Sequence, residues 1–297
     1  MKNFYHTGVL VDQAIAGLNV FPKEKYIDAT IGGGDHTAKI MELGGIVLGL
    51  DQDVNAIKYC QKRFGHQLQK KQLTLVHTNF EKIDEVAKAR DFVNVSGILY
   101  DLGISSFQME DPTRGFSFRF KDAPLDMRMG EQTGVKACDL LNALPQKALE
   151  EIFFKYGNIR EAKKLVQEII RARTNQRFVT VGDLLTTLMR IKKDFTRDDF
   201  AAKVFLSLRI AVNLELEVLS QSLPKAQSLL DKDGRLAVIS FQGLEDGVVK
   251  NFGRGASSTL VSLSVPMRCE IIANPRSRSA KLRVYRFRGS KNEIAKK

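Results

Sequence analysis

The sequence predicts an α/β protein with a doubly wound, mostly parallel sheet of the Rossmann-like type, interrupted by an inserted all-helical domain. Three observations predict this fold. A glycine turn, Gly32 to Gly34, lies between a strand-like segment and a helix start. Asp51 ends the next apolar strand nineteen residues after Gly32, the spacing at which an acidic side chain meets a ribose in such folds. Strands and helices alternate up to about residue 103, whereas only helical periodicity follows from 135 to 193.

Each element of the first part follows from its residue pattern. Residues 95–102 are mostly apolar, as expected for a central strand covered on both faces, and residues 9–18 have the spacing of an amphipathic helix at the sheet edge. We expect strands at 25–30, 45–50, 72–78 and 95–102, and helices at 9–18, 37–43, 54–64 and 83–90.

The remaining elements are expected to leave the sheet and then return to it. A structured loop at 110–131 precedes helices at 137–144, 146–156, 160–174 and 181–191. One long helix at 198–220, strands at 234–241, 267–272 and 282–287, and a helix at 244–251 complete the chain. The predicted domains are a discontinuous sheet domain of residues 1–108 and 213–297 and a helical insertion of residues 109–212.

The charge balance favours a polyanionic partner. The 297 residues include 46 Lys and Arg against 34 Asp and Glu, a net charge of +12, for which nucleic acid is the simplest partner. A basic surface kept only for solubility is the alternative. Cys60, Cys138 and Cys269 are widely spaced, so we expect neither a disulfide framework nor a metal site. The sequence has no signal-peptide core and no apolar segment of about 20 residues, so we expect a cytoplasmic protein with no membrane association.

The residues around the glycine turn restrict the class of ligand that it is expected to bind. The dinucleotide fingerprint G-x-G-x-x-G is incomplete, because no glycine follows Gly34 at the required spacing. Asp28, at the end of the first strand, suits a ligand with an ammonium group, which an amino-acid moiety has and a dinucleotide lacks. The pattern therefore favours S-adenosylmethionine, with a tight turn that binds nothing as the alternative.

Two further strand ends contribute polar groups to the same edge of the sheet. Asp101 ends the fourth strand and is followed by Gly103 and two serines, which place a carboxylate and hydroxyl groups where a reacting group is expected. An ordinary surface loop is the alternative. Asn79 and Phe80 follow the third strand and would offer an amide and a ring to an adenine, unless Phe80 is a core residue.

Two basic segments favour contact with nucleic acid. From Arg114 to Phe120 arginine is interleaved with aromatic rings, which suits phosphate neutralisation and base stacking worth roughly 1–3 kcal/mol per base. Core packing is the alternative for some of these rings. Arg128 follows an acid two residues earlier and is either a phosphate contact or half of a structural ion pair. Residues 268–288 hold seven basic residues and one acid, with Arg276 and Arg278 in a loop of phosphate-binding groups; a solvated charge run is the alternative.

Seven blocks of the sequence together resemble one enzyme family. They are Asp28-x-Thr30-x-Gly32-x-Gly34-x-His36, Asp101-Leu-Gly-Ile-Ser-Ser-x-Gln108, Arg114-Gly-Phe-Ser-Phe118, Pro124-Leu-Asp-Met-Arg-Met129, Leu208-Arg-Ile-x-Val-Asn213-x-Glu-Leu216, Ile239-Ser-Phe-x-x-Leu-Glu-Asp246 and Asn274-Pro-Arg-Ser-Arg-Ser-Ala280. Over residues 6–284 the chain is similar to the ribosomal small subunit methyltransferase H family, bacterial enzymes that methylate N4 of a cytidine in 16S ribosomal RNA.

The resemblance implies a class I methyltransferase with S-adenosylmethionine as donor, no metal, and the small ribosomal subunit as substrate. By position, the residues at the donor are Gly34, Asp35, His36, Asp51, Phe80, Asp101 and Gln108. The first three would meet the methionine end, Asp51 the ribose and Phe80 the adenine. The helical insertion would contact RNA together with four arginines, which are Arg114, Arg128, Arg276 and Arg278. As the catalytic residue, Asp101 would accept hydrogen bonds from the cytosine amine and orient it in line with the methyl group.

The chain departs from the family at three positions. Asp35 stands where the family usually has a second glycine, and Gln242 and Gly247 stand where it has His and Arg. Two alternatives therefore stay open: an RNA-binding protein of the same fold without methyl transfer, and a methyltransferase for another RNA or DNA base. A homodimer is a further open alternative for its assembly.

Overall fold

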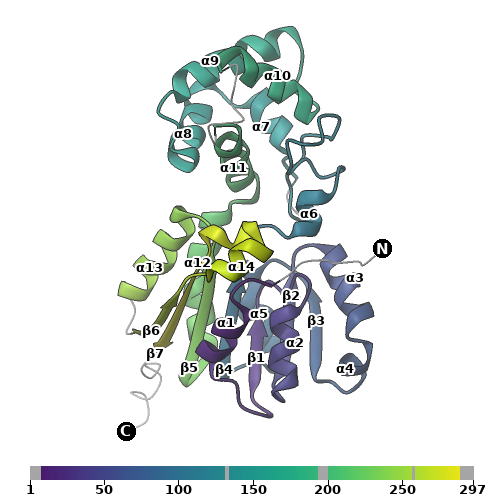
Figure 1. Cartoon of the computed structure of the whole chain (residues 1–297), viewed down its shortest axis with the longest axis vertical. Coiled ribbons are helices and arrows are strands. Elements are labelled where there is room, and N and C mark those ends of the chain that lie inside the picture. Colours follow the sequence, from purple (N-terminus) through teal and green to yellow (C-terminus); the bar gives the residue numbers. More distant parts are fainter. Residues whose placement is uncertain (1–7, 131–133, 193–199, 256–257, 288–297) are drawn as a thin grey trace. The chain divides into compact units, whose positions relative to one another are not determined.

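A computed structural model describes residues 8–130, 134–192, 200–255 and 258–287 of the chain (Figure 1). The chain divides into two compact units, residues 1–105 with 216–297, and residues 106–215. The divisions lie three residues from the expected boundaries at 108 and 213.

The first unit contains the sheet and the helices that cover it. Its described strands are β1 (Lys25–Asp28), β2 (Ile46–Asp51), β3 (Leu73–His77), β4 (Val95–Asp101), β5 (Leu230–Ser240), β6 (Ser258–Ser264) and β7 (Lys281–Phe287). Its described helices are α1 (Val11–Leu18), α2 (Asp35–Glu42), α3 (Val54–Arg63), α4 (Gly65–Gln69), α5 (Ile83–Ala89), α12 (Glu215–Leu229), α13 (Gly243–Gly255) and α14 (Arg268–Ala273), with the 3-10 helices η1 (Phe80–Lys82) and η2 (Pro275–Ser279).

The strands form one sheet in the order β3-β2-β1-β4-β5-β7-β6 within the described residues. The pairs from β3 to β5 are parallel, whereas β7 is antiparallel to both β5 and β6. The predicted Rossmann-like, mostly parallel sheet is confirmed.

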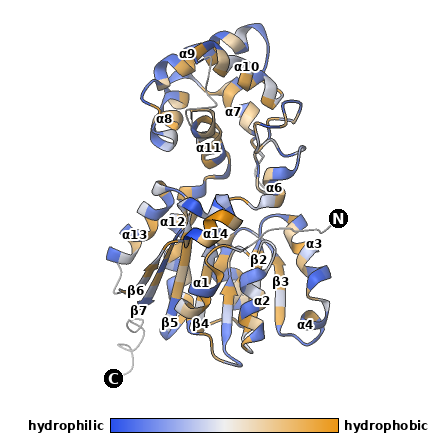
Figure 2. Cartoon of the chain, in the orientation of Figure 1, coloured by the Kyte–Doolittle hydropathy of each residue, from blue (hydrophilic) through white to orange (hydrophobic). Residues whose placement is uncertain are grey.

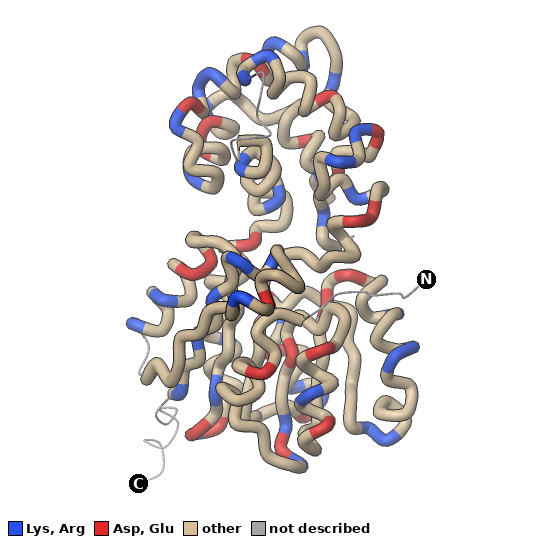
Figure 3. Tube along the Cα trace, in the orientation of Figure 1, with Lys and Arg blue, Asp and Glu red and all other residues tan. Residues whose placement is uncertain are grey.

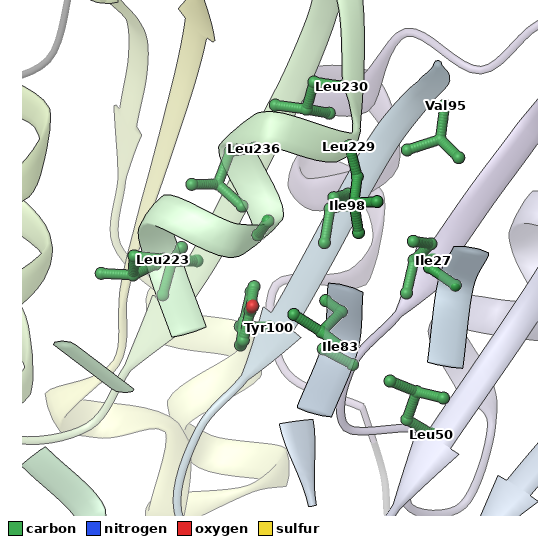
Figure 4. Packing of buried hydrophobic residues seen from close by; sticks show 14 of the residues in the cluster. Ile27, Leu50, Ile83, Val95, Ile98, Tyr100, Leu223, Leu229, Leu230 and Leu236 are labelled. Atoms are coloured by element: carbon green, nitrogen blue, oxygen red, sulfur yellow. The ribbon is translucent and has the colours of Figure 1, made fainter. Parts of the chain in front are cut away.

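Two apolar layers sandwich this sheet, because successive residues of a strand point to opposite faces. In β1, Tyr26 packs with α1, α2 and α3, and Ile27 packs with α5, α12 and α13 on the other face. Figure 4 shows the second layer, where Leu223 and Leu229 of α12 lie near Tyr100 and Ile98 of β4. The central strands are accordingly largely hydrophobic in Figure 2. Burial on both faces fixes the register and thereby the height at which each strand ends.

Two expectations for the last third of the chain are wrong. The single helix expected over 198–220 is two helices in its described part, because Leu214 between them has φ +49°, which interrupts the helix; residues 198 and 199 lie outside the described residues. The strand expected at 267–272 is helix α14, in which the amide of Asn274 donates to the Glu270 carbonyl at 2.7 Å. The outer strand of the closing pair is instead β6.

The second unit consists, in its described residues, of helices and a long loop that follows Glu110, with one isolated bridge between Pro124 and Thr180. Its described helices are α6 (Ser106–Glu110), α7 (Ala137–Ala143), α8 (Gln146–Gly157), α9 (Ala162–Asn175), α10 (Val181–Ile191) and α11 (Phe200–Asn213). Helix α8 packs against α9 and α11, and α10 packs against α9. The Asn213 side chain accepts from the Met129 amide at 2.7 Å and donates to the Met127 carbonyl at 2.8 Å, so the long loop is fixed to the end of α11.

Candidate functional site

Three aspartates lie at the carboxyl edge of the central strands. Asp28, Asp51 and Asp101 are the last residues of β1, β2 and β4, and these strands are neighbours in the parallel sheet. Asp28 is in register with Gly49 and Leu99 of the flanking strands. Adjacent parallel strands therefore bring together carboxylates that are far apart in the sequence, at the edge where open α/β sheets bind ligands.

The loop between β1 and α2 has a backbone that requires glycine. Gly34 has φ +79°, and a Cβ there would lie 2.5 Å from the Phe64 ring. The Gly34 amide donates to the Ile31 carbonyl at 2.7 Å, and the Gly32 amide donates to Asp51 Oδ2 at 2.9 Å. The loop is thus held against β2, and α2 begins directly after it at Asp35, where amide groups of a first helical turn lack helical partners.

Asp28 supports this loop from inside. Its side chain is 1% exposed, and Oδ2 accepts the Thr37 hydroxyl of α2 at 2.7 Å, while Oδ1 accepts the Thr30 amide at 3.3 Å. Burial raises the pKa of Asp28 to about 6. Its contacts tie the end of β1 to the first turn of α2.

Asp51 is partly exposed and already accepts two backbone hydrogen bonds. Oδ1 accepts the Asp53 amide at 2.8 Å and Oδ2 accepts the Gly32 amide at 2.9 Å. Burial raises the pKa of Asp51 to about 7 against the opposing effect of these two amides. Both carboxylate oxygens keep further lone pairs, so a neighbouring diol could donate to them.

Asp101 is held beside His36. Its amide donates to the Thr30 hydroxyl at 2.6 Å, and its Oδ2 lies 3.8 Å from His36 Nδ1. His36 Nε2 lies 3.1 Å from the Val9 carbonyl, which can only accept, so Nε2 carries a hydrogen and Nδ1 faces the carboxyl. Burial raises the pKa of Asp101 well above its usual range, and the nearby negative charges of Asp28, Glu245 and Asp35 raise it further.

The second oxygen of Asp101 lacks a hydrogen-bond partner among the described residues. Oδ1 is buried and has no hydrogen-bond partner within the described part of the chain. A buried acceptor without a donor costs about 1–3 kcal/mol. This oxygen is therefore suited to a donor that comes from a ligand, such as an amine.

Phe80 is partly buried and partly exposed. Its ring meets Tyr100 edge to face, with centroids 5.3 Å apart and planes at 78°. Ser222 of α12 donates to the Phe80 carbonyl at 2.9 Å and shares a 2.6 Å hydrogen bond with the Tyr100 hydroxyl. The Asn79 amide group donates to Gln52 Oε1 at 2.9 Å. Phe80 therefore packs on the core, as the alternative from the sequence proposed, while its partly exposed position leaves the contact with an adenine a prediction.

The four predicted RNA contacts have different surroundings. In the second unit, Arg114 donates to the carbonyls of Arg128 and Met129, both at 2.9 Å. Arg128 pairs with both oxygens of Asp126, at 2.7 and 2.8 Å. These two arginines stabilise their own loop, whereas Arg276 and Arg278, in η2 of the first unit, are exposed.

Two aromatic rings of the arginine-rich segment also differ. Phe116 is 5% exposed and belongs to the core of its unit, as the alternative for these rings proposed. Phe118 is 43% exposed and meets Phe205 edge to face at 5.8 Å. Gln108 is buried in α6 of the second unit, and its contribution to the donor site stays a prediction.

Sequence reasoning missed three neighbours of the site. Thr30 positions the Asp101 backbone, Arg63 pairs with Asp35 at 2.7 Å, and Glu245 is a buried acid at the start of α13 that accepts the Phe241 amide at 2.8 Å. Thr30 lies in the glycine-turn block and could have been found there. Glu245 likewise lies in the quoted block that ends at Asp246, whereas Arg63 carries no local signal, because its role depends on how α3 packs beside the glycine loop.

The described residues contain no group of three or more His, Cys, Asp or Glu placed to hold a metal ion. A search of the same residues finds no helix with the length and apolar character needed to span a bilayer.

Known proteins resemble the chain over nearly its whole length. The model of the MraW methylase family matches residues 3–288. A protein of Bacteroides fragilis named Ribosomal RNA small subunit methyltransferase H is 36% identical over 301 residues, covering 94% of this chain and 96% of that protein. A protein of the same name from Lactiplantibacillus plantarum is 39% identical over 310 residues, covering 95% and 97%. A solved structure of a putative rRNA-methylase from Clostridium thermocellum is similar only loosely, with a TM-score of 0.47 and 13% identity over 96% of this chain and 98% of that one.

Proposed function

This chain belongs to the MraW methylase family, and from that premise we propose that it transfers a methyl group from S-adenosylmethionine to N4 of a cytidine in 16S ribosomal RNA of the small subunit. The unsatisfied, buried Oδ1 of Asp101 carries the proposal, because it offers an acceptor to an exocyclic amine at the edge of the sheet.

The residues at this edge fit the methyl donor. S-adenosylmethionine, when bound, supplies an electrophilic methyl group. Gly34, Asp35 and His36 would receive its methionine end, since the positive φ of Gly34 leads the chain into α2, whose first amide groups begin there. Asp51 would accept from the ribose hydroxyls, and the exposed side of Phe80 would contact the adenine. The family resemblance adds Gln108 to these donor-binding residues.

Asp101 would orient the cytosine amine. The lone pair of that amine is delocalised into the ring, so the enzyme must hold N4 in line with the methyl group. An N4–H donated to Asp101 Oδ1 would satisfy the buried oxygen and fix the amine. Methyl transfer leaves N4 positively charged, and its proton then passes to the carboxylate, whose raised pKa makes it a better proton acceptor. The base must be unstacked to reach this position.

Basic helices of the second unit would contact the RNA backbone. The side of α9 that is exposed carries Lys163, Lys164 and Arg171, and Figure 3 marks further Lys and Arg along the helices of this unit. In the first unit, Arg276 and Arg278 are exposed in η2. We assign the first unit to donor binding and catalysis and the second to RNA recognition, and place the reaction in the cytoplasm, where the ribosome is assembled.

The test is methylation by the purified full chain of isolated small ribosomal subunits, free 16S RNA and DNA, followed by nucleoside mass spectrometry. We expect N4-methylcytidine in the subunits, and at least a hundredfold lower rate with Asp101→Asn while the donor still binds. Methyl groups on another base, or on DNA alone, would reject the substrate. Unchanged turnover of Asp101→Asn would reject its role.

A further inference from the structure

Helix α3 binds the carbonyl groups of the glycine loop. The Cys60 thiol donates to the Gly32 carbonyl at 3.3 Å, and a guanidinium N–H of Arg63 donates to the Gly33 carbonyl. Cys60 and Arg63 are three positions apart, so both lie on the side of α3 that faces the loop. Two carbonyl dipoles of the loop are therefore directed at α3, where a donor satisfies each of them.

Arg63 also neutralises the carboxylate of Asp35, the residue that directly follows the glycine loop. Asp35 Oδ1 accepts from Arg63 Nη1 at 2.7 Å, and Asp35 Oδ2 accepts the Gly8 amide at 2.9 Å. The side chains of Arg63 and Asp35 are 33% and 28% exposed, so the pair lies at the surface of the loop where a ligand can approach. A ligand at the start of α2 therefore meets an ion pair instead of a bare negative charge.

The binding of a charged amino-acid moiety depends on whether it meets the ion pair or an uncompensated Asp35 carboxylate. The amide groups in the first turn of α2 attract its carboxylate end, and Asp35 is the first residue of that turn. Without a counter-ion, the Asp35 carboxylate would repel the ligand carboxylate at short range. Arg63 would not contact the ligand itself. It would act through its ion pair with Asp35 and its hydrogen bond to the Gly33 carbonyl.

We propose that Arg63 is a positioning residue of the donor site, which cancels the charge of Asp35 and holds the Gly33 carbonyl toward α3, so that the loop accepts the carboxylate of the donor's amino-acid part. This inference rests on the proposed placement of the methionine end at Gly34–His36.

Two ligands separate the charge effect from general damage to the site. S-adenosylhomocysteine carries the amino-acid carboxylate, whereas 5′-methylthioadenosine has the same adenosine and thioether without it. Titration calorimetry of the full chain should show Arg63→Met binding S-adenosylhomocysteine about tenfold more weakly than the wild type, and 5′-methylthioadenosine within about twofold. Higher salt should reduce the loss. The matched control is Lys62→Met, which removes the same charge from the exposed side of α3 and should change neither affinity.

A second substitution tests the link through Asp35. In Asp35→Asn/Arg63→Met most of the lost affinity should return, because no uncompensated carboxylate remains. Asp35→Asn alone should bind S-adenosylhomocysteine at least as tightly as the wild type, which tests the inference even if Arg63→Met does not fold. An equal loss for both ligands, no recovery in the double variant, or weaker binding by Asp35→Asn would overturn it. A wild-type chain that binds neither ligand would instead overturn the proposed donor site.

Discussion

Replacing Asp28 with Asn should stabilise the protein at neutral pH while weakening its activity. Asp28 is 1% exposed, and burial raises its pKa from an ordinary 3.8 to about 6. The folded chain therefore binds this proton more tightly than the unfolded chain does. The resulting stability is fully present below pH 4 and is lost as the pH rises through 6. A rise in the pKa from 3.8 to about 6 corresponds to about 3 kcal/mol of unfolding free energy.

Asn is neutral at every pH and still offers an oxygen to the Thr37 hydroxyl. The stability of Asp28→Asn relative to the wild type should thus be near zero at pH 4 and rise to about 3 kcal/mol at pH 7.5, or roughly 6–12 °C in Tm. Urea unfolding followed by circular dichroism at pH 4, 5, 6, 7 and 8 measures this difference. Asp12→Asn, at an exposed position of α1, is the matched control and should show no such rise.

Unfolding free energies that differ by a constant amount at every pH, or a lower stability of Asp28→Asn than of the wild type at pH 7.5, would contradict this expectation. A donor affinity unchanged by the substitution would separately show that the negative charge of Asp28 is not needed for donor binding, because Asn keeps the acceptor for the Thr37 hydroxyl.

Three further predictions concern the loop, the edge aromatic and the RNA. Gly34→Ala should lose donor binding and at least about 1–2 kcal/mol of stability, since φ is +79° and Phe64 fills the space of a Cβ; normal calorimetric binding would contradict this. Ser222→Ala leaves the Phe80 carbonyl and the Tyr100 hydroxyl without their common partner, so stability should fall by about 1–3 kcal/mol and donor affinity with it, whereas exposed Ser228→Ala should be silent in the same assays. The affinity of the protein for small subunits should fall steeply between 50 and 200 mM salt, which filter binding can measure. An affinity that does not depend on salt would exclude binding through the phosphates of the RNA backbone.

The carboxyl edge was predictable from sequence because it depends on local patterns. Alternating and apolar runs identify β1, β2 and β4, and parallel pairing then places Asp28, Asp51 and Asp101 on one edge. The glycine turn likewise follows from residue type, since Gly34 adopts a backbone that other residues avoid.

Other features depend on packing that no local pattern reports. Leu214 ends α11 with a positive φ although leucine is a good helix former, so the expected helix ran on through it. Residues 267–271 alternate apolar and charged side chains, as a strand would, but the segment is too short for this pattern to distinguish a strand from a helix. Arg114 and Arg128 bind groups within their own loop, and a sequence of interleaved Arg and Phe has the same appearance whether the cations meet phosphates or carbonyls.

The neighbouring strands β4 and β5 have a consequence for how the chain folds. Residues 102–229, which include the whole helical unit, separate them in the sequence. Closing a loop of that length as flexible chain is slow, and each doubling of its length costs only about 0.6 kcal/mol more. Helices α7 to α11 pack against one another within a single segment of the chain and can form before the sheet closes, which would shorten the effective loop. We therefore expect the helical unit to set the order of events: β1 to β4 and the helices form first, and the half of the sheet that begins at β5 joins last.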